Sequence, residues 1–188
     1  MQIHSTQLGD RKEVYEDQPW YAIYTRHQHE KAVAQCLTGK GFQVFLPLYA
    51  DLRRRKDRTK LLALPLFPCY VFVNGGLDRR GDIVITPGIH ALVSNSGQPA
   101  AIPNGEIDAL RRAMDSGAQV EPHPLMKCGD RVRVKCGFLR ELEGILVRKR
   151  NIYRLVLSVE MLGKAVAVEV DAVTVERISG NRSGACHG

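Results

Sequence analysis

One stretch of the sequence decides the fold, and it is Pro65-Leu66-Phe67-Pro68-Cys69-Tyr70-Val71-Phe72-Val73. It predicts a strand that is apolar on both sides, because side chains alternate across a strand. One face would then carry Phe67, Cys69, Val71 and Val73, and the other Tyr70 and Phe72. Both faces need cover, either from other parts of the domain or from a partner.

Upstream of this stretch, Trp20 to Tyr24 predicts a second strand, which we expect to pair with the strand of Phe72. A helix should follow, since Thr25 and Gln28 have the spacing of a capping box and Gly39 ends the pattern. The apolar positions at helical spacing are Val33, Cys36 and Leu37. Cys36 and Cys69 are therefore interpreted as core residues.

Between this helix and the deciding stretch, residues 43–46 predict a short strand, and residues 52–62 predict a hairpin or long loop with a basic tip. Further on, residues 77–85 favour a short helix and residues 89–93 a strand. Asn104 is a candidate N-cap for a helix that Gly117 ends, with its apolar face formed by Ile107, Leu110 and Met114.

The C-terminal part is β in character. Apolar residues alternate at period two in several short runs, separated by glycines, which is typical of a small SH3-like barrel. The fold class is therefore α+β, an α/β sandwich followed by a β-barrel. The expected divisions are a disordered tail at 1–18, a first domain at 19–117, a linker at 118–126, a barrel at 127–178 and a tail at 179–188.

Composition sets broad limits on function. The 188 residues carry a net charge of +7, which suits a polyanionic partner without requiring one. None of the five cysteines forms a CxxC pair, which favours reduced thiols. Because the sequence has no apolar leader and no run long enough to span a membrane, we expect a cytoplasmic protein with no membrane partner.

Enzyme signatures are missing from the sequence. It contains no GxxxxGK[ST], GxGxxG, GxSxG or HExxH motif, and His27 and His29 are too close together to share one helix face. A nucleophilic Cys36 or Cys69 paired with a histidine stays open, although buried thiols outnumber reactive ones. We therefore expect no catalytic residue, no cofactor and no metal.

Three separated segments resemble the NusG family of transcription elongation and antitermination factors. Pro65 to Val73 is similar to the family's Pro-Leu-Phe-Pro-x-Tyr-x-Phe-Val segment, especially that of the specialised paralogues RfaH and UpxY. Trp20 to Thr25 resembles the family's opening strand, and Gly129 to Val134 with Gly144 resembles its KOW motif. The resemblance implies a NusG N-terminal domain followed by a KOW barrel.

The resemblance also implies roles for individual residues. An aromatic patch would bind the clamp helices of RNA polymerase through Tyr24, Phe67, Pro68, Tyr70 and Phe72. From the residues alone, packing in the core is the better interpretation of these aromatics. Upstream or non-template DNA would meet Arg26, Arg53, Arg54, Arg55, Lys56, Arg58 and Lys60. A solvated hairpin tip is the alternative for this basic run.

In the barrel, the resemblance places a partner site at Met161, Leu162, Gly163 and Lys164. The family usually has Phe where this chain has Leu162, and the partner would be termination factor Rho or a ribosomal protein. Arg79 to Asp82 does not match the His-Thr-Thr segment with which RfaH-like paralogues touch the polymerase gate loop.

Taken with the motifs, these roles predict a monomeric, non-enzymatic factor. It would brace the polymerase clamp, suppress pausing and antiterminate, while its KOW barrel recruits a second machine. The alternative from another class is a KOW-containing RNA- or ribosome-binding protein. The valines at period two and the glycines favour a β barrel in the free protein over a helical hairpin.

Overall fold

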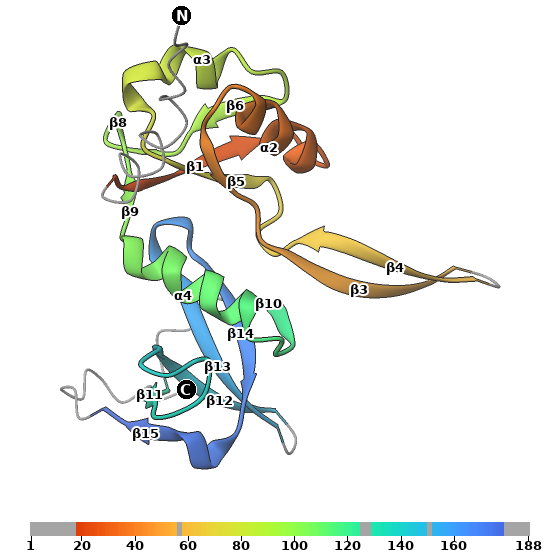
Figure 1. Cartoon of the computed structure of the whole chain (residues 1–188), viewed down its shortest axis with the longest axis vertical. Helices are drawn as coiled ribbons and strands as arrows, with labels where there is room; N and C mark the ends of the chain where they lie inside the picture. The colour runs from red at the N-terminus through yellow and green to blue at the C-terminus, as the bar shows by residue number, and fades with distance from the viewer. Residues whose placement is uncertain (1–17, 56–57, 125–128, 150–151, 179–188) are drawn as a thin grey trace, which may run out of the picture. The chain divides into compact units, whose positions relative to one another are not determined.

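The computed structural model describes residues 18–55, 58–124, 129–149 and 152–178 (Figure 1). The chain divides into two compact units, Met1–Leu46 with Pro68–Asn104, and Pro47–Phe67 with Gly105–Gly188. The expected tails were 1–18 and 179–188, and apart from Gln18 their residues lie outside the described residues. The expected α+β class is confirmed, with helices and a sheet in the first unit and an antiparallel sheet in the second.

The first unit is built on an antiparallel sheet with the strand order β2-β5-β1-β6, and β9 also pairs with β1. Its strands are β1 (Trp20–Thr25), β2 (Gln43–Phe45), β5 (Tyr70–Asn74), β6 (Ile89–Leu92) and β9 (Ala101–Ile102). β1 and β5 pair in the register Ala22 to Phe72, which confirms the expected pairing of these two strands. Ser94–Asn95 (β7) and Gln98–Pro99 (β8) form a small hairpin.

The helices of this unit are α2 (Glu30–Gly39) and α3 (Arg80–Val84), with a 3-10 turn, η1 (Leu77–Arg79), before α3. One face of the sheet forms an apolar core with residues of these helices and their loops, namely Tyr21, Ile23, Val33, Leu37, Phe42, Val71, Val73, Ile83 and Leu92. The expected alternation of the deciding stretch is confirmed on this face for Val71 and Val73.

Two expectations about α2 are wrong. The helix begins at Glu30 with His29 as its N-cap and no side-chain cap, because Thr25 still belongs to β1 and Gln28 has a left-handed φ of 63°. The Thr25–Gln28 capping box therefore does not form. Cys36 is exposed, since the buried face of the helix is formed by Glu30, Val33 and Leu37.

The deciding strand is shorter than expected. It begins at Tyr70, because Cys69 has a φ of 67°, a left-handed conformation that an extended strand cannot contain. Phe67 and Cys69 therefore precede the strand and do not share the face of Val71 and Val73. The left-handed Cys69 makes a turn of the residues between the hairpin and β5.

In the second unit, β3 (Leu48–Arg55) and β4 (Arg58–Pro65) pair with each other as a separate two-stranded sheet (Figure 1). This confirms the hairpin, whose base is closed by the Leu66 N–H, which donates to the Pro47 carbonyl at 2.9 Å. The expected helix is present as α4 (Asn104–Asp115), with Asn104 as its first residue where an N-cap was expected. Its buried residues are Ile107, Leu110 and Ala113, and Met114 is half-buried.

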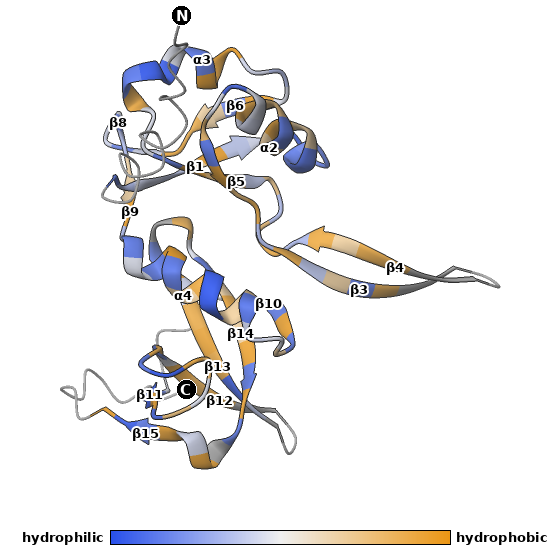
Figure 2. Ribbon diagram, in the orientation of Figure 1, coloured by the Kyte–Doolittle hydropathy of each residue, from blue (hydrophilic) through white to orange (hydrophobic). Residues whose placement is uncertain are grey.

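The C-terminal sheet has the antiparallel order β10-β14-β13-β12-β11-β15. Its strands are β10 (Val120–Pro124), β11 (Asp130–Val134), β12 (Glu143–Lys149), β13 (Ile152–Val159), β14 (Lys164–Val170) and β15 (Val175–Arg177). The 3-10 turns η2 (Glu160–Leu162) and η3 (Ala172–Thr174) flank β14. Figure 2 shows how apolar β13 and β14 are. The expected β structure of this region is therefore confirmed.

The segment expected to be a linker contains β10. Its residues 120–124 pair with β14 in the register Val120 to Val168, and Val120 is buried. The prolines at 122 and 124 suggested a stiff connection, but Pro is compatible with an edge strand, and β10 lies at the edge of the sheet.

Gly144 explains why the KOW-like pattern needs a glycine. It lies on β12 opposite Val132, and a Cβ atom there would come within 2.5 Å of the Val156 carbonyl oxygen. A backbone atom in a sheet cannot move aside as a flexible side chain can. Any larger residue at 144 would therefore displace β12 from β13.

Candidate functional site

An exposed aromatic surface lies where β1, β5 and β6 run side by side. We call Tyr24, Tyr70 and His90 the Tyr24 surface. The ring of Tyr24 lies 5.6 Å from that of Tyr70 and is stacked on His90 at 5.5 Å, measured between centroids. Tyr24 is 43% exposed although its ring contacts two others. Partial burial raises the pKa of Tyr70, and the neighbouring Tyr24 and Cys69 add to this effect.

The other predicted aromatic contacts are not at the surface. Phe72 is fully buried and packs against Phe45 with ring centroids 6.1 Å apart, and Phe45 in turn contacts Trp20. Phe67 is only 1% exposed. The expectation that Phe72 faces solvent in the free protein is therefore wrong. Pro68 is exposed, so the structure brings Tyr24, Pro68 and Tyr70 to the outside but neither phenylalanine.

The loop that follows β1 is held by backbone hydrogen bonds. The Thr25 N–H donates to the Cys69 carbonyl at 2.9 Å, and the Arg26 N–H donates to the Gly88 carbonyl at 2.8 Å. Arg26, a predicted DNA contact, is exposed on this fixed loop. The loop therefore presents a cation close in sequence to Tyr24.

The remaining predicted DNA contacts belong to the hairpin. Arg53 pairs across the strands with Lys60, and Arg55 pairs with Arg58, so these basic residues gather at the end of the ribbon. Arg54 lies between them on β3, and Lys56 lies outside the described residues.

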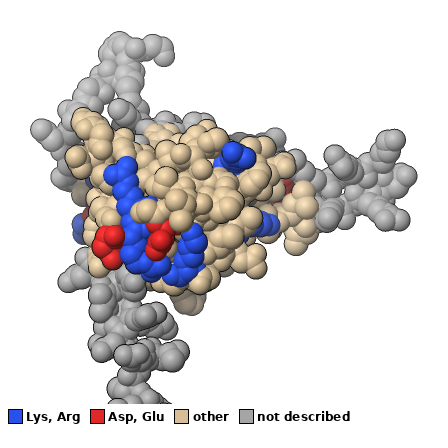
Figure 3. All heavy atoms as spheres, turned by 90° about the horizontal axis from the view of Figure 1, so that it is seen from above, with Lys and Arg blue, Asp and Glu red and all other residues tan. Residues whose placement is uncertain are grey.

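Arg79, on another part of the first unit, is held by contacts within that unit. On the face seen in Figure 3, some basic side chains lie beside acidic ones and others stand apart from any acidic side chain. Arg79 pairs with Asp82 at 3.1 Å, donates to the Lys40 carbonyl and stacks over Phe42 at 4.4 Å. The segment that departs from the RfaH-like pattern thus has a structural role within this unit.

The predicted partner site of the barrel lies at the turn between β13 and β14. Met161 and Leu162 belong to η2, and Gly163 follows with a left-handed φ of 59°. Lys164 is exposed, whereas Leu162 is half-buried. These residues are contiguous, so the structure keeps them together as one turn.

Glu106 of α4 lies close to Glu160 of this turn. Burial raises the pKa of Glu106 and the charge of Glu160 adds to the rise, against a smaller opposing effect of a backbone hydrogen bond at Glu160. Among the described residues, Glu106 Oε2 is buried without a hydrogen-bond partner. The carboxylate is therefore less stable in its charged form when the protein is folded.

We expect Glu106→Gln to raise stability at neutral pH and to have little effect in acid. The Glu106 carboxyl group binds its proton more tightly in the folded than in the unfolded state, because its pKa is raised on folding. The free energy of unfolding therefore falls as the pH rises from the ordinary glutamate pKa through the raised pKa of Glu106. Urea unfolding at several pH values measures this, with Glu141→Gln, an exposed glutamate, as the control. Identical pH profiles for the wild type and Glu106→Gln would contradict it.

Sequence reasoning missed three features of the surface. His90 joins the aromatic surface through β6, and Phe138 is 84% exposed in the second unit. The third is partly buried: His27, Glu30 and Cys69 come together, with their ligand atoms within 4.8 Å of one another. A pair of Cys69 with a histidine was left open by the sequence, and the structure places His27 Nδ1 at 3.8 Å from Cys69 Sγ, but the part of Glu30 was not expected. The β1–β5 pairing and the Thr25–Cys69 hydrogen bond, once recognised, could have placed residue 27 near residue 69.

The described site offers exposed aromatic and basic groups on an α+β frame. Comparison with known proteins gives the family of the chain. The family described as "Transcription termination factor nusG" matches residues 18–111, half of the chain. The chain belongs to the NusG family, whose members are non-enzymatic transcription termination and antitermination factors.

Relatives match along most of the chain. The chain is 25% identical over 177 residues to the transcription termination/antitermination protein NusG of Halalkalibacterium halodurans, and 26% identical over 174 residues to that of Pseudomonas aeruginosa. Each match covers 85% of this chain and 98% of the relative. A solved structure titled "Domain interaction in Thermotoga maritima NusG" is similar in fold, with a TM-score of 0.50 at 20% identity, over 87% of this chain and 98% of that one.

Within the described part of the chain, no helix is both long and apolar enough to cross a membrane.

Proposed function

We propose that this chain is a specialised NusG paralogue, similar to RfaH and UpxY, that binds the clamp helices of RNA polymerase, suppresses pausing and antiterminates. The observation that carries the proposal is the exposure of Tyr24 beside Tyr70, at the positions where the family resemblance implies a polymerase contact. Tyr24, Pro68 and Tyr70 make the contact, and Phe72 supports them from within by fixing β5.

The chemistry of this surface suits a protein partner. Exposed tyrosines bury a large area at little cost in side-chain freedom, and their hydroxyls can find polar partners at an interface. The Tyr24 ring is already fixed by contacts with two other rings, so little side-chain entropy is lost on binding. A paired-helix partner would place its apolar side chains over these rings.

Retention on core RNA polymerase tests the proposal. The full chain, immobilised and challenged separately with core polymerase and with ribosomes, should retain polymerase in the absence of DNA and of other factors. Retention of ribosomes alone would favour the alternative, a KOW-containing ribosome-binding protein.

We further propose that the hairpin and Arg26 contact upstream or non-template DNA. The support is the concentration of Arg53, Arg54, Arg55, Arg58 and Lys60 at one end of β3 and β4. Guanidinium groups bind phosphate through paired hydrogen bonds, and such binding is largely independent of sequence. The hairpin forms its own sheet, so its tip can meet DNA without disturbing the pairing of other strands.

Reversing Arg53, Arg54 and Arg55 to Glu should weaken binding to a complete elongation complex, chiefly at low salt, and should leave binding to polymerase without DNA intact. Each lost phosphate contact makes the negative slope of log K against log salt less steep by about 0.9. Titrations at several salt concentrations measure this. The control makes the same change in net charge on exposed residues of the C-terminal sheet region, by reversing Arg131, Lys135 and Arg140. Equal losses with and without DNA would mean that the hairpin touches protein.

The C-terminal module recruits a second partner in this proposal, either Rho or a ribosomal protein. The contiguous turn Met161 to Lys164 supports a contact there, and Leu162, in place of the usual aromatic residue, should make it weak. The match of the family over residues 18–111 supports a first domain at 19–117 that includes the hairpin and α4. The barrel expected at 127–178 then gains β10, because residues 120–124 pair with β14. The protein acts as a cytoplasmic monomer in this account.

A further inference from the structure

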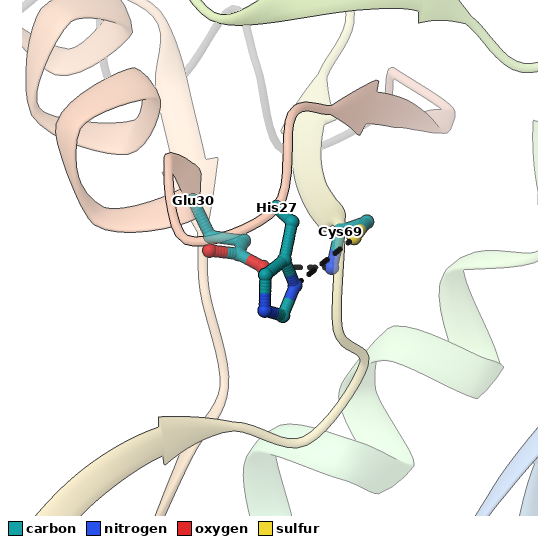
Figure 4. Close-up of side chains that lie close together, drawn as sticks. All are labelled: His27, Glu30 and Cys69. Atoms are coloured by element: carbon teal, nitrogen blue, oxygen red, sulfur yellow. Dashed lines mark hydrogen bonds between the residues drawn. The ribbon is translucent and has the colours of Figure 1, made fainter.

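Three potential metal ligands meet between the end of β1 and the turn before β5 (Figure 4). Cys69 Sγ lies 3.8 Å from His27 Nδ1, and the Cys69 N–H donates to Glu30 Oε1 at 2.8 Å. A nitrogen, a sulfur and a carboxylate oxygen thus lie within 4.8 Å of one another, all in the first unit. None of these groups has a part in the proposed binding to polymerase or DNA.

The distance between sulfur and nitrogen fits a shared metal ion. Zinc binds cysteine sulfur at about 2.3 Å and histidine nitrogen at about 2.0 to 2.1 Å, so tetrahedral geometry separates the two ligand atoms by about 3.6 Å. The observed separation between Cys69 Sγ and His27 Nδ1 is 3.8 Å.

Glu30 supplies the reason for a cation at this point. Its side chain is 4% exposed, and within the described residues it pairs with no Lys, Arg or His. A buried carboxylate is costly unless its charge is balanced, and the Cys69 N–H and the start of α2 balance it only in part. A divalent ion bound between Glu30, His27 and Cys69 would balance it directly.

The surroundings already fix these ligands. The Thr25 N–H donates a hydrogen bond to the Cys69 carbonyl. This bond holds the loop that contains His27 close to the turn that contains Cys69 in the absence of an ion. His27 is exposed, which leaves a path from solvent and room for water as a fourth ligand. A mixed set of sulfur, nitrogen and oxygen favours zinc over magnesium or calcium, which prefer oxygen ligands alone.

We propose that His27, Glu30 and Cys69 bind a zinc ion. The ion ties the loop after β1 to the turn before β5, next to Tyr70 and the Tyr24 surface. It therefore adds stability to the first unit. Because the thiol and the imidazole must lose their protons to bind, affinity falls as the pH is lowered.

Competition with a chromophoric zinc chelator tests the site on the metal-free full chain. One zinc ion per chain is expected, and His27→Ala, Cys69→Ser and Glu30→Gln should each weaken binding by about tenfold or more, equivalent to about 1.4 kcal/mol. Glu30→Gln keeps an oxygen acceptor for the Cys69 N–H, and His27 is exposed, so both variants should fold. The controls are Cys36→Ser and Cys136→Ser, which remove exposed cysteines elsewhere and should bind zinc as the wild type does.

Binding of Co²⁺ provides a second measurement, because its absorption spectrum reports directly on a bound cysteine sulfur. Bound Co²⁺ should produce a thiolate-to-cobalt charge-transfer band that Cys69→Ser abolishes and Cys36→Ser retains. Zinc should also raise the melting temperature of the wild type but not that of His27→Ala. Wild-type affinity in His27→Ala or Cys69→Ser, or loss of binding in Cys36→Ser, would overturn the proposal. Neither result depends on whether the chain binds polymerase.

Discussion

Tyr24→Ala should abolish retention on RNA polymerase while changing the free energy of unfolding by less than about 1 kcal/mol. The Tyr24 side chain is 43% exposed, so its removal costs little packing in the core. The same removal deletes the side chain at the centre of the proposed interface. Interface energy concentrates in such aromatic residues, and truncating one can cost about 2 to 4 kcal/mol of binding, which is a loss of roughly 30-fold to 1,000-fold in affinity. Titration against core polymerase and urea unfolding of the same preparation measure the two effects.

Phe138→Ala is the matched control for Tyr24→Ala. It removes an aromatic side chain that is even more exposed, at 84%, but belongs to the second unit. Polymerase affinity should be unchanged in this variant. If Phe138→Ala and Tyr24→Ala weaken binding equally, the Tyr24 surface has no special part in the contact.

Phe72→Ala should behave in the opposite way and lower the free energy of unfolding by about 3 to 5 kcal/mol. Its ring is fully buried and packs on Phe45, so truncation leaves a cavity that rigid sheet neighbours cannot fill. Loss of polymerase binding would then follow from unfolding. Urea denaturation measures the change, with Phe72→Leu, which removes less volume, as a comparison that should cost less than Phe72→Ala.

A loss below about 1 kcal/mol for Phe72→Ala would mean that the side chain is not part of the core in solution. The original surface of five polymerase contacts would then regain support. The variants Tyr24→Ala and Phe72→Ala, on the paired strands β1 and β5, thus distinguish a residue that contacts polymerase from a residue that stabilises the core.

The sequence predicted the strands and their pairing well because alternation at period two is a local signal. It could not predict which aromatic residues are covered. Residues 65–73 are apolar at nearly every position, so the pattern gives two faces but does not tell which one is packed. Phe72 is covered and Tyr24 is not, and this depends on neighbours such as Phe45 that come from β2.

Left-handed residues account for two of the wrong expectations. Gln28 and Cys69 both have positive φ, which no residue-type signal predicts because neither is Gly or Asn. The first moved the start of α2 to Glu30, and the second moved the start of β5 to Tyr70. The same two turns bring His27, Glu30 and Cys69 together, so the cluster was hidden for the same reason.

We propose above all that the Tyr24 surface binds the clamp helices of RNA polymerase. The most direct test of this binding compares the affinity of the full chain for intact core polymerase with its affinity for core polymerase whose clamp-helix tip has been deleted. The account predicts tight binding to the intact enzyme and loss of binding to the deleted one, with Tyr24→Ala reproducing that loss on the intact enzyme. Equal affinity for the two polymerases would contradict it.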